Sequence, residues 1–180
     1  RQVNGLFATK LIVYLCPMKK VSILVPETAV LAAIADPRYM FTAVNQFFTS
    51  TGLPPMFEVQ LVGLSKEVRL NEGLFSIYPD KLLDEVGQTD LIFIPALSGD
   101  MKTALELNKD LVPWLVRQYQ NGAEVASLCI GAFLLASTGL LRGKQCSTHW
   151  LYANEFRQMF PDVELMDGSI ITEDQGIYSS

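Results

Sequence analysis

Hydrophobic positions along the chain follow two alternating patterns. Short apolar runs rich in β-branched residues occupy residues 21–26, 90–97 and 123–129, as expected of strands that are covered on both faces. Residues 28–48 and 105–122 carry apolar side chains at helical spacing instead. This alternation of buried strands and helices predicts a doubly wound, flavodoxin-like α/β fold, with a mostly parallel sheet and helices on both faces.

The remaining segments fit the same architecture. Residues 57–65 alternate like a strand, and residues 67–80 predict a small hairpin with its turn at 71–73. Pro37 is expected to break or kink the helix that contains it, because proline has no amide hydrogen to donate. Another helix is predicted over residues 131–141.

Composition limits the classes of protein that the chain can represent. The chain has 180 residues, 49% hydrophobic and 18% charged, which fits one domain that buries roughly 70% of its unfolded surface. Its formal net charge is −5. The largest clusters of basic residues in the sequence are the pair Lys19 and Lys20 and the loose pair Arg142 and Lys144. A nucleic-acid interface normally needs a basic face. We therefore expect no DNA contact from this chain itself.

The cysteines and the N-terminal segment indicate the compartment. Three cysteines at positions 16, 129 and 146 form no CxxC pair, and the one histidine is His149, so we expect no metal, no disulfide framework and a reducing cytoplasm. The apolar run at 11–16 is far shorter than the ~20 residues that span a bilayer, so we expect no membrane partner. Residues 1–17 are interpreted as a leader or upstream extension ahead of a domain at 18–180, because residue 18 begins a natural start that leads into the first strand.

Cys129 stands where a strand-like run changes into a helix-forming run. Ser127 and Gly131 lie two residues to either side, which is the small-x-nucleophile-x-small spacing of a nucleophile elbow. The N-terminus of the following helix would favour the thiolate. The alternative is that Cys129 is a small buried hydrophobic residue.

Two further residues are candidates for chemistry beside this thiol. His149 supplies the imidazole of the chain and could act as a base, or it could cap a helix or pack beside Trp150. In doubly wound sheets ligands bind beyond the carboxyl ends of the strands, and Cys129, Pro95 and Glu27 all fall at such ends of predicted strands. Glu27 could instead stabilise the N-terminus of the helix that follows it.

A longer series of motifs resembles a known family. Residues 122–165 contain Cys-x-Gly-Ala-Phe, then Gly-Leu-Leu-x-Gly, Thr-His-Trp and Phe-Pro, in this order. The series resembles the class I glutamine amidotransferase-like sensor domain of AraC-type transcriptional regulators, within the wider PfpI-type superfamily. Residues 93–99 resemble the strand and oxyanion loop of that family.

The resemblance assigns roles to particular residues. It implies an acidic side chain at Glu27 near the thiol of Cys129, and it implies a pocket or oxyanion site formed by Ala96, Leu97, Ile130 and Gly131. Two positions depart from the pattern of the hydrolases in this superfamily. Those enzymes place a histidine directly after the cysteine, where this chain has Ile130, and Ala96-Leu97 replaces their usual Gly-Gly. Both changes favour a vestigial catalytic site.

The resemblance predicts a ligand-sensing and dimerising domain of an AraC-type regulator, with a small metabolite bound over Cys129 and no cofactor. A last helix and a DNA-binding module would follow residue 180, so DNA would be a partner only through that module, and the chain itself would form a homodimer. One alternative is a cysteine enzyme, isonitrile hydratase-like or amidase-like, in which the Ile130 N–H binds the oxyanion and His149 or Glu27 carries the proton. Another is a redox or stress-protective protein with a reactive thiol.

Overall fold

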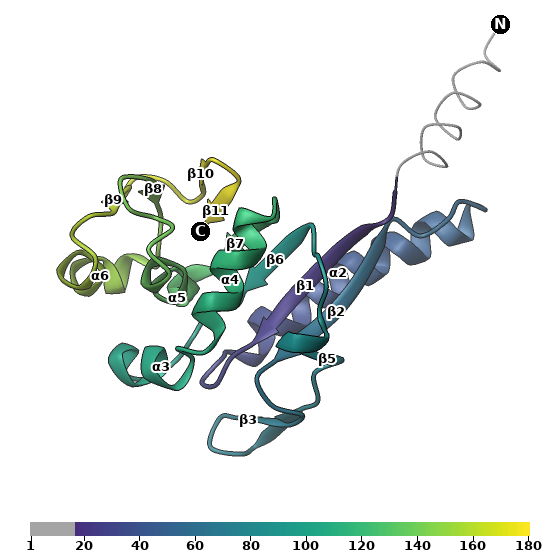
Figure 1. Cartoon of the computed structure of the whole chain (residues 1–180), viewed down its shortest axis with the longest axis horizontal. Coiled ribbons are helices and arrows are strands. Elements are labelled where there is room, and N and C mark those ends of the chain that lie inside the picture. The colour runs from purple at the N-terminus through teal and green to yellow at the C-terminus, as the bar shows by residue number, and fades with distance from the viewer. Residues whose placement is uncertain (1–16) are drawn as a thin grey trace, which may run out of the picture.

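A seven-stranded sheet organises the computed structural model, which is described here for residues 17–180 (Figure 1). Cys16 and nearly all of the extension expected at 1–17 lie outside the described residues. The strand order is β10-β11-β7-β6-β1-β2-β5, and all neighbouring pairs are parallel except β10 with β11. The strands are β1 (Lys19–Val25), β2 (Phe57–Gly63), β5 (Lys81–Leu82), β6 (Leu91–Ile94), β7 (Glu124–Ser127), β10 (Thr172–Asp174) and β11 (Ile177–Ser179).

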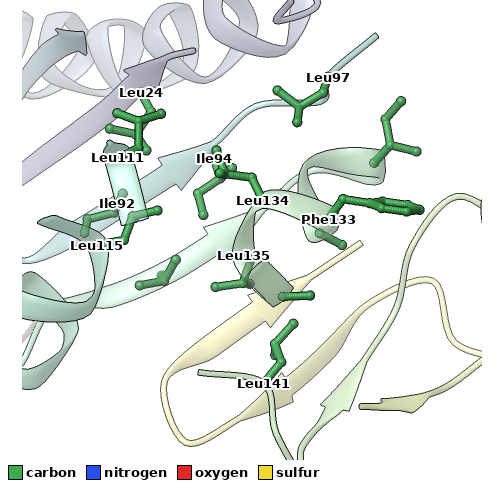
Figure 2. Close-up of a cluster of buried hydrophobic side chains, with 14 of the residues drawn as sticks. Leu24, Ile92, Ile94, Leu97, Leu111, Leu115, Phe133, Leu134, Leu135 and Leu141 are labelled. Carbon is green, nitrogen blue, oxygen red and sulfur yellow. The ribbon is translucent and has the colours of Figure 1, made fainter. Parts of the chain in front are cut away.

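Helices cover both faces of this sheet, which confirms the doubly wound α/β class. Along β1, the side chains of Val21, Ile23 and Val25 join a cluster with α2, whereas Leu24 points to the opposite face and joins the larger core (Figure 2). The helices are α2 (Leu31–Ser50), α3 (Met101–Leu107), α4 (Leu111–Gln120), α5 (Ala132–Ser137) and α6 (Ala153–Met159), with short 3₁₀ turns η1 (Leu83–Glu85), η2 (Cys129–Gly131) and η3 (Trp150–Tyr152). In the described part of the chain, no helix combines the length and the apolar content needed to cross a bilayer.

The helical segments differ from the sequence prediction in three places. Helix α2 continues through Pro37 without a break, because burial of Pro37 and Ile34 against the sheet side holds the helix in spite of the missing amide hydrogen. Residues 105–122 form the end of α3 and all of α4 rather than one helix. The helix predicted over 131–141 ends at Ser137, and Gly139 then takes a positive φ of 77°.

The described part of the chain forms two small hairpins, one separate from the main sheet and one at its edge. The hairpin predicted over 67–80 is confirmed as β3 (Val68–Leu70) and β4 (Phe75–Ile77), with positive φ at residues 71 to 73. A second hairpin, β10–β11, was not predicted. Its turn at Gln175 and Gly176 lets β11 pair with β7, which brings the described chain's last residue beside Cys129. Strands β8 (Gln145–Cys146) and β9 (Glu164–Leu165) form a separate parallel pair.

Candidate functional site

Cys129 lies on a tight turn directly after β7. Its φ is 54°, a left-handed value that non-glycine residues rarely adopt, and its side chain is half-buried. The turn is held by neighbouring backbone: Leu128 N–H donates to the carbonyl of Ile94 (3.0 Å), and Cys129 N–H donates to that of Ser180 (2.6 Å). The backbone geometry of the predicted elbow is therefore present.

Gly131 explains why the elbow needs a small residue after the cysteine. A Cβ at this position would lie 2.5 Å from the carbonyl oxygen of Pro95 and 2.9 Å from that of Ile94. These are backbone atoms that cannot move away cheaply. The glycine thus lets η2 approach the end of β6, and so it joins the elbow to the predicted oxyanion loop.

The other predicted pocket residues are mostly core residues. Leu97 is fully buried, Ala96 is 8% exposed, and Ile130 is 7% exposed. Ile130 occupies the position of the hydrolase histidine, and its side chain belongs to the hydrophobic core cluster rather than to a proton-transfer path. The backbone of Ala96 still helps to join the loops after β1 and β6, because its carbonyl accepts a hydrogen bond from Val30 N–H (2.8 Å). Leu97 forms an isolated antiparallel β-bridge with Ala29 beside it.

Glu27 sits at the end of β1 in the loop that these contacts hold. Its backbone N–H donates to Oδ1 of Asn108 (2.8 Å), and its carbonyl accepts from Nδ2 of Asn108 (2.9 Å). The next residue, Thr28, has a φ of 67°, which is strained for a β-branched side chain. The structure thus brings the loops after β1, β6 and β7 together through backbone contacts.

His149 caps the N-terminus of η3, which is the alternative to a catalytic base that the sequence left open. Its Nδ1 accepts from Leu151 N–H (3.2 Å) at the start of η3, and its ring stacks on Trp150 with centroids 5.6 Å apart. Its neighbour Thr148 makes the direct link to the elbow, because Thr148 Oγ1 donates to the Cys129 carbonyl (3.2 Å). The imidazole segment is therefore attached to the elbow through Thr148.

Cys146 is the opposite kind of thiol. It lies in β8, is fully buried, and its Sγ donates to the Ser147 carbonyl (3.3 Å). Burial raises the pKa of the Cys146 thiol to about 11, although a hydrogen bond with Ser179 acts in the other direction. Cys146 is a structural cysteine, whereas Cys129 is the candidate for chemistry.

An apolar cavity of about 530 Å³ lies beside the elbow rather than over its thiol. Leu128 and Phe93 line it from the sheet, and helix α2 forms its opposite wall. Cys129 is not among its lining residues. A second cavity of about 370 Å³ shares Leu128 and Phe93 and continues along β7 and β11. Together the two cavities mark a half-covered strip on the α2 face of the sheet.

Several residues of the site were not found from the sequence. Thr148 and Ser180 contact the backbone of Cys129, and Asn108 holds Glu27. Gly176 is a turn residue that could have indicated the hairpin whose second strand leads to Ser180. Asn108 carried no such signal, because an asparagine within an apolar helical pattern does not show what it will contact.

Other proteins of known structure have the same fold. A Vibrio parahaemolyticus protein assigned as a transcriptional regulator superposes with a TM-score of 0.78 at 21% identity, covering 91% of this chain and 83% of that one. Drosophila melanogaster DJ-1beta superposes with a TM-score of 0.63 at 19% identity, covering 91% and 81%. The DJ-1/PfpI family profile matches residues 19–180. The chain belongs to the DJ-1/PfpI family.

Two curated relatives are transcriptional regulators from Pseudomonas aeruginosa. The HTH-type transcriptional regulator GbdR is 28% identical over 100 residues, which cover 56% of this chain and 26% of that protein. The HTH-type transcriptional regulator CdhR is 27% identical over 110 residues, which cover 58% and 32%. The match thus spans about a quarter to a third of the length of these relatives.

Proposed function

We propose that this domain is the ligand-sensing and dimerising part of an AraC-type transcriptional regulator. The observation that carries the proposal is the similarity of its DJ-1/PfpI domain to HTH-type regulators. The domain has an acidic balance of −5, so contact with DNA belongs to a separate module. A small molecule that binds beyond the carboxyl ends of β1, β6 and β7 biases that module by favouring one state of this domain.

Two features support sensing over strong catalysis at Cys129. Ile130 places a buried hydrocarbon where the hydrolases have an imidazole. The Nδ1 of His149 is engaged as an acceptor in the η3 cap, so this nitrogen is not available as a base unless the cap opens. The site keeps the elbow and its neighbouring loops but lacks the immediate Cys–His pair.

Helix α2 supplies a candidate surface for a two-fold dimer. An apolar stripe begins at the N-cap of α2 and recurs at spacings of three and four residues: Val30, Ala33, Pro37, Met40, Val44 and Phe47. Its inner members line the cavity between α2 and the sheet. Met40 and Phe47 are 65% and 66% exposed. This spacing suits the packing of another helix, and a second copy of α2 offers the same stripe, so a two-fold axis would make the contact self-complementary.

Sedimentation velocity tests the dimer. The chain is expected to sediment as a dimer at tens of micromolar, and the pair Met40→Glu with Phe47→Glu is expected to yield monomer. Tyr39→Glu is the matched control, because Tyr39 is 75% exposed on α2 but lies outside the stripe. A wild-type monomer contradicts the dimer, and a dimer that resists both stripe substitutions contradicts this surface.

A ligand screen tests sensing. Thermal unfolding of the chain with a panel of small metabolites is expected to reveal one that raises Tm, with a changed response in Cys129→Ser.

A residue 1–180 fragment is expected to bind duplex DNA only non-specifically, with a dissociation constant above ~1 µM at physiological salt. Sequence-selective, salt-resistant binding by this fragment contradicts the assignment of DNA contact to another module.

A cysteine enzyme is the second candidate, and the strained φ of 54° at Cys129 is the observation that favours it. In that case the thiol attacks an amide or isonitrile, and the backbone N–H of Ile130 stabilises the developing charge. Assays with simple amides and isonitriles distinguish the two candidates. Robust turnover that disappears in Cys129→Ser replaces the sensor proposal with the enzyme, and its absence supports the sensor.

A further inference from the structure

The backbone of Cys129 is held by residues that are distant in the sequence. Its N–H donates to the carbonyl of Ser180 (2.6 Å), and its carbonyl accepts from Thr148 Oγ1 (3.2 Å) as well as from Ala132 N–H within the turn. The left-handed φ of 54° has to be imposed by such contacts, because this angle is unfavourable for a residue with a Cβ. The conformation of the elbow therefore depends on the positions of Thr148 and Ser180.

A buried cluster of hydroxyl groups lies directly beside these two residues in the chain. It consists of Ser147, Thr172 and Ser179, all of which are buried. Ser147 bonds Ser179 twice, because its N–H donates to Ser179 Oγ (2.9 Å) and its Oγ donates to the Ser179 carbonyl (2.6 Å). Thr172 Oγ1 shares a hydrogen bond with Ser179 Oγ (2.7 Å). A buried hydroxyl that loses such a partner is costly, so the cluster holds its members together.

The elbow and the hydroxyl cluster form one closed ring of contacts. From the Cys129 carbonyl, the ring passes to Thr148 and along the chain to Ser147. It then crosses the cluster to Ser179 and follows the chain to Ser180, whose carbonyl bonds the Cys129 N–H. A displacement of the turn at Cys129 therefore has to stretch or break a bond of this ring.

The β10–β11 hairpin is the part of the ring that is held least strongly. It lies at the edge of the main sheet beside β7 (Figure 1), and β11 pairs with β7 over the three residues Ile177–Ser179. Ile177 is the one buried apolar side chain that the two strands of the hairpin contribute, whereas Phe133, Leu134 and Leu135 of α5 are all fully buried. Segments with few buried apolar contacts open at a lower free energy than a packed core. We therefore expect strain at the elbow to appear first as opening of this hairpin.

We propose that the β10–β11 hairpin reports the state of the elbow. A group bound at Cys129 that displaces the turn loosens the docking of the hairpin on β7, and a loosened hairpin in turn frees the turn. This inference deepens the proposed sensing function and rests on it, because sensing makes Cys129 the place where a ligand acts. Coupling between two elements is reciprocal, so it can be measured in both directions.

Amide hydrogen exchange followed by NMR tests the direction from the elbow to the hairpin. The whole chain carries Cys16→Ser in every sample, and Cys146 is fully buried, so iodoacetamide is expected to modify Cys129. The thiolate forms a bond to carbon as iodide leaves, and the thiol proton goes to the buffer. The adduct is expected to speed exchange of the β10 and β11 amides by about 5-fold or more. Amides of β1 and of the separate β3–β4 hairpin are expected to keep their rates.

Ser179→Ala tests the direction from the hairpin to the elbow, because it removes the hydroxyl that the rest of the cluster bonds. The readout is exchange at Leu128 and Gly131, whose N–H groups donate to the carbonyls of Ile94 and Leu128 and make no bond to the hairpin. Both amides are expected to exchange faster relative to the amides of β1. Should Ser179→Ala fail to fold, Thr172→Val removes one outer hydroxyl of the cluster and is expected to give a smaller change in the same direction.

A second buried serine provides the matched control. Ser22 of β1 is fully buried, and its Oγ donates to Thr89 Oγ1 (3.0 Å) and accepts from Gln60 Nε2 (3.0 Å). Ser22→Ala thus removes a comparable hydroxyl from the same sheet. It is expected to lower Tm without a selective change at Leu128 and Gly131.

The outcomes separate this coupling from the proposed function. Hairpin amides that keep their rates in the alkylated protein overturn the inference. Elbow amides that respond to Ser22→Ala as strongly as to Ser179→Ala also overturn it, because the effect would then be a general loss of stability. Coupling in both directions, in a chain whose Tm no metabolite raises, supports this inference while it counts against sensing.

Discussion

The loops at the two ends of the parallel sheet differ in their backbone strain and in the hydrogen bonding of their polar atoms. At the carboxyl ends, Thr28 and Cys129 hold left-handed backbone angles, and the buried Oγ1 of Thr28 has no hydrogen-bond partner among the described residues. At the amino ends, the Asp90 carboxylate accepts from Lys20 N–H (2.8 Å) and from Lys19 Nζ (3.3 Å). Both ends belong to the same strands, so strand composition does not cause the difference. Strain gathers where ligands bind in this class of fold, and it is held there by the rest of the structure.

A pair of glycines gives the largest expected contrast between the two ends. Gly131→Ala is expected to lower the free energy of unfolding by about 3 kcal/mol, because the new Cβ meets the Pro95 carbonyl at the elbow. Gly87 lies in the loop before β6, at the amino ends, and a Cβ there meets nothing within 4 Å, so Gly87→Ala is expected to be nearly neutral. Urea denaturation measures both. Equal small effects would show that the elbow has room to relax.

The thiols sharpen the contrast between the elbow and the core. With a pKa of about 11 against the ordinary 9.0, Cys146 holds ~100-fold less thiolate than an unperturbed thiol at neutral pH. We expect Cys129 to react with iodoacetamide at least ~100-fold faster than Cys146, since Cys146 is also buried. Rates from peptide mass spectrometry at pH 7.5 provide the check. A Cys146 that reacts as fast as Cys129 would contradict both the elbow and the buried environment.

Thr28 tests whether strain is stored at the carboxyl ends. Thr28→Gly removes the cost of a positive φ and an unpartnered hydroxyl, so it is expected to raise the free energy of unfolding by about 1 kcal/mol after the entropy cost of glycine. Thr28→Ala keeps the strained angle and is the matched control, with a smaller gain expected. Thermal denaturation of the three proteins makes the comparison. Destabilisation by glycine would mean that packing of the Thr28 side chain outweighs the strain.

Asp90 gives the smallest expected effect and reports on the amino ends. A backbone hydrogen bond from Lys20 and the charge of Lys19 hold the pKa of Asp90 below its ordinary value. The ionised form therefore stabilises the fold above the unfolded-state pKa, and this contribution is lost as pH falls through the lowered folded-state pKa. Asp90→Asn is expected to cost less than about 1 kcal/mol at pH 7, since the side chain is 43% exposed, and the cost is expected to shrink as the carboxylate is protonated in acid. A cost that persists in acid would assign the effect to something other than charge.

Local patterns in the sequence were sufficient to predict the central strands of the sheet and the elbow. Apolar runs located β1, β6 and β7, and the small residues around Cys129 located the turn, because both signals depend on neighbours in the sequence.

Contacts between distant segments could not be predicted in this way. The break at Asn108 depends on hydrogen bonds to Glu27, 81 residues away in the chain, and no local pattern records them. Pro37 argued for a broken helix, yet packing against the sheet overrides that local preference. The strand that carries Ser179 lacked a long apolar run, although its turn signal was present in the sequence.

The hydrogen bond from Cys129 N–H to the Ser180 carbonyl has a consequence for the order of folding. The strands β1, β2, β5, β6 and β7 come from the first 127 residues, but the elbow gains this support only when the β10–β11 hairpin pairs with β7. Domains generally fold as units. We therefore expect a half-made chain on the ribosome, which lacks this hairpin, to carry no organised turn at Cys129.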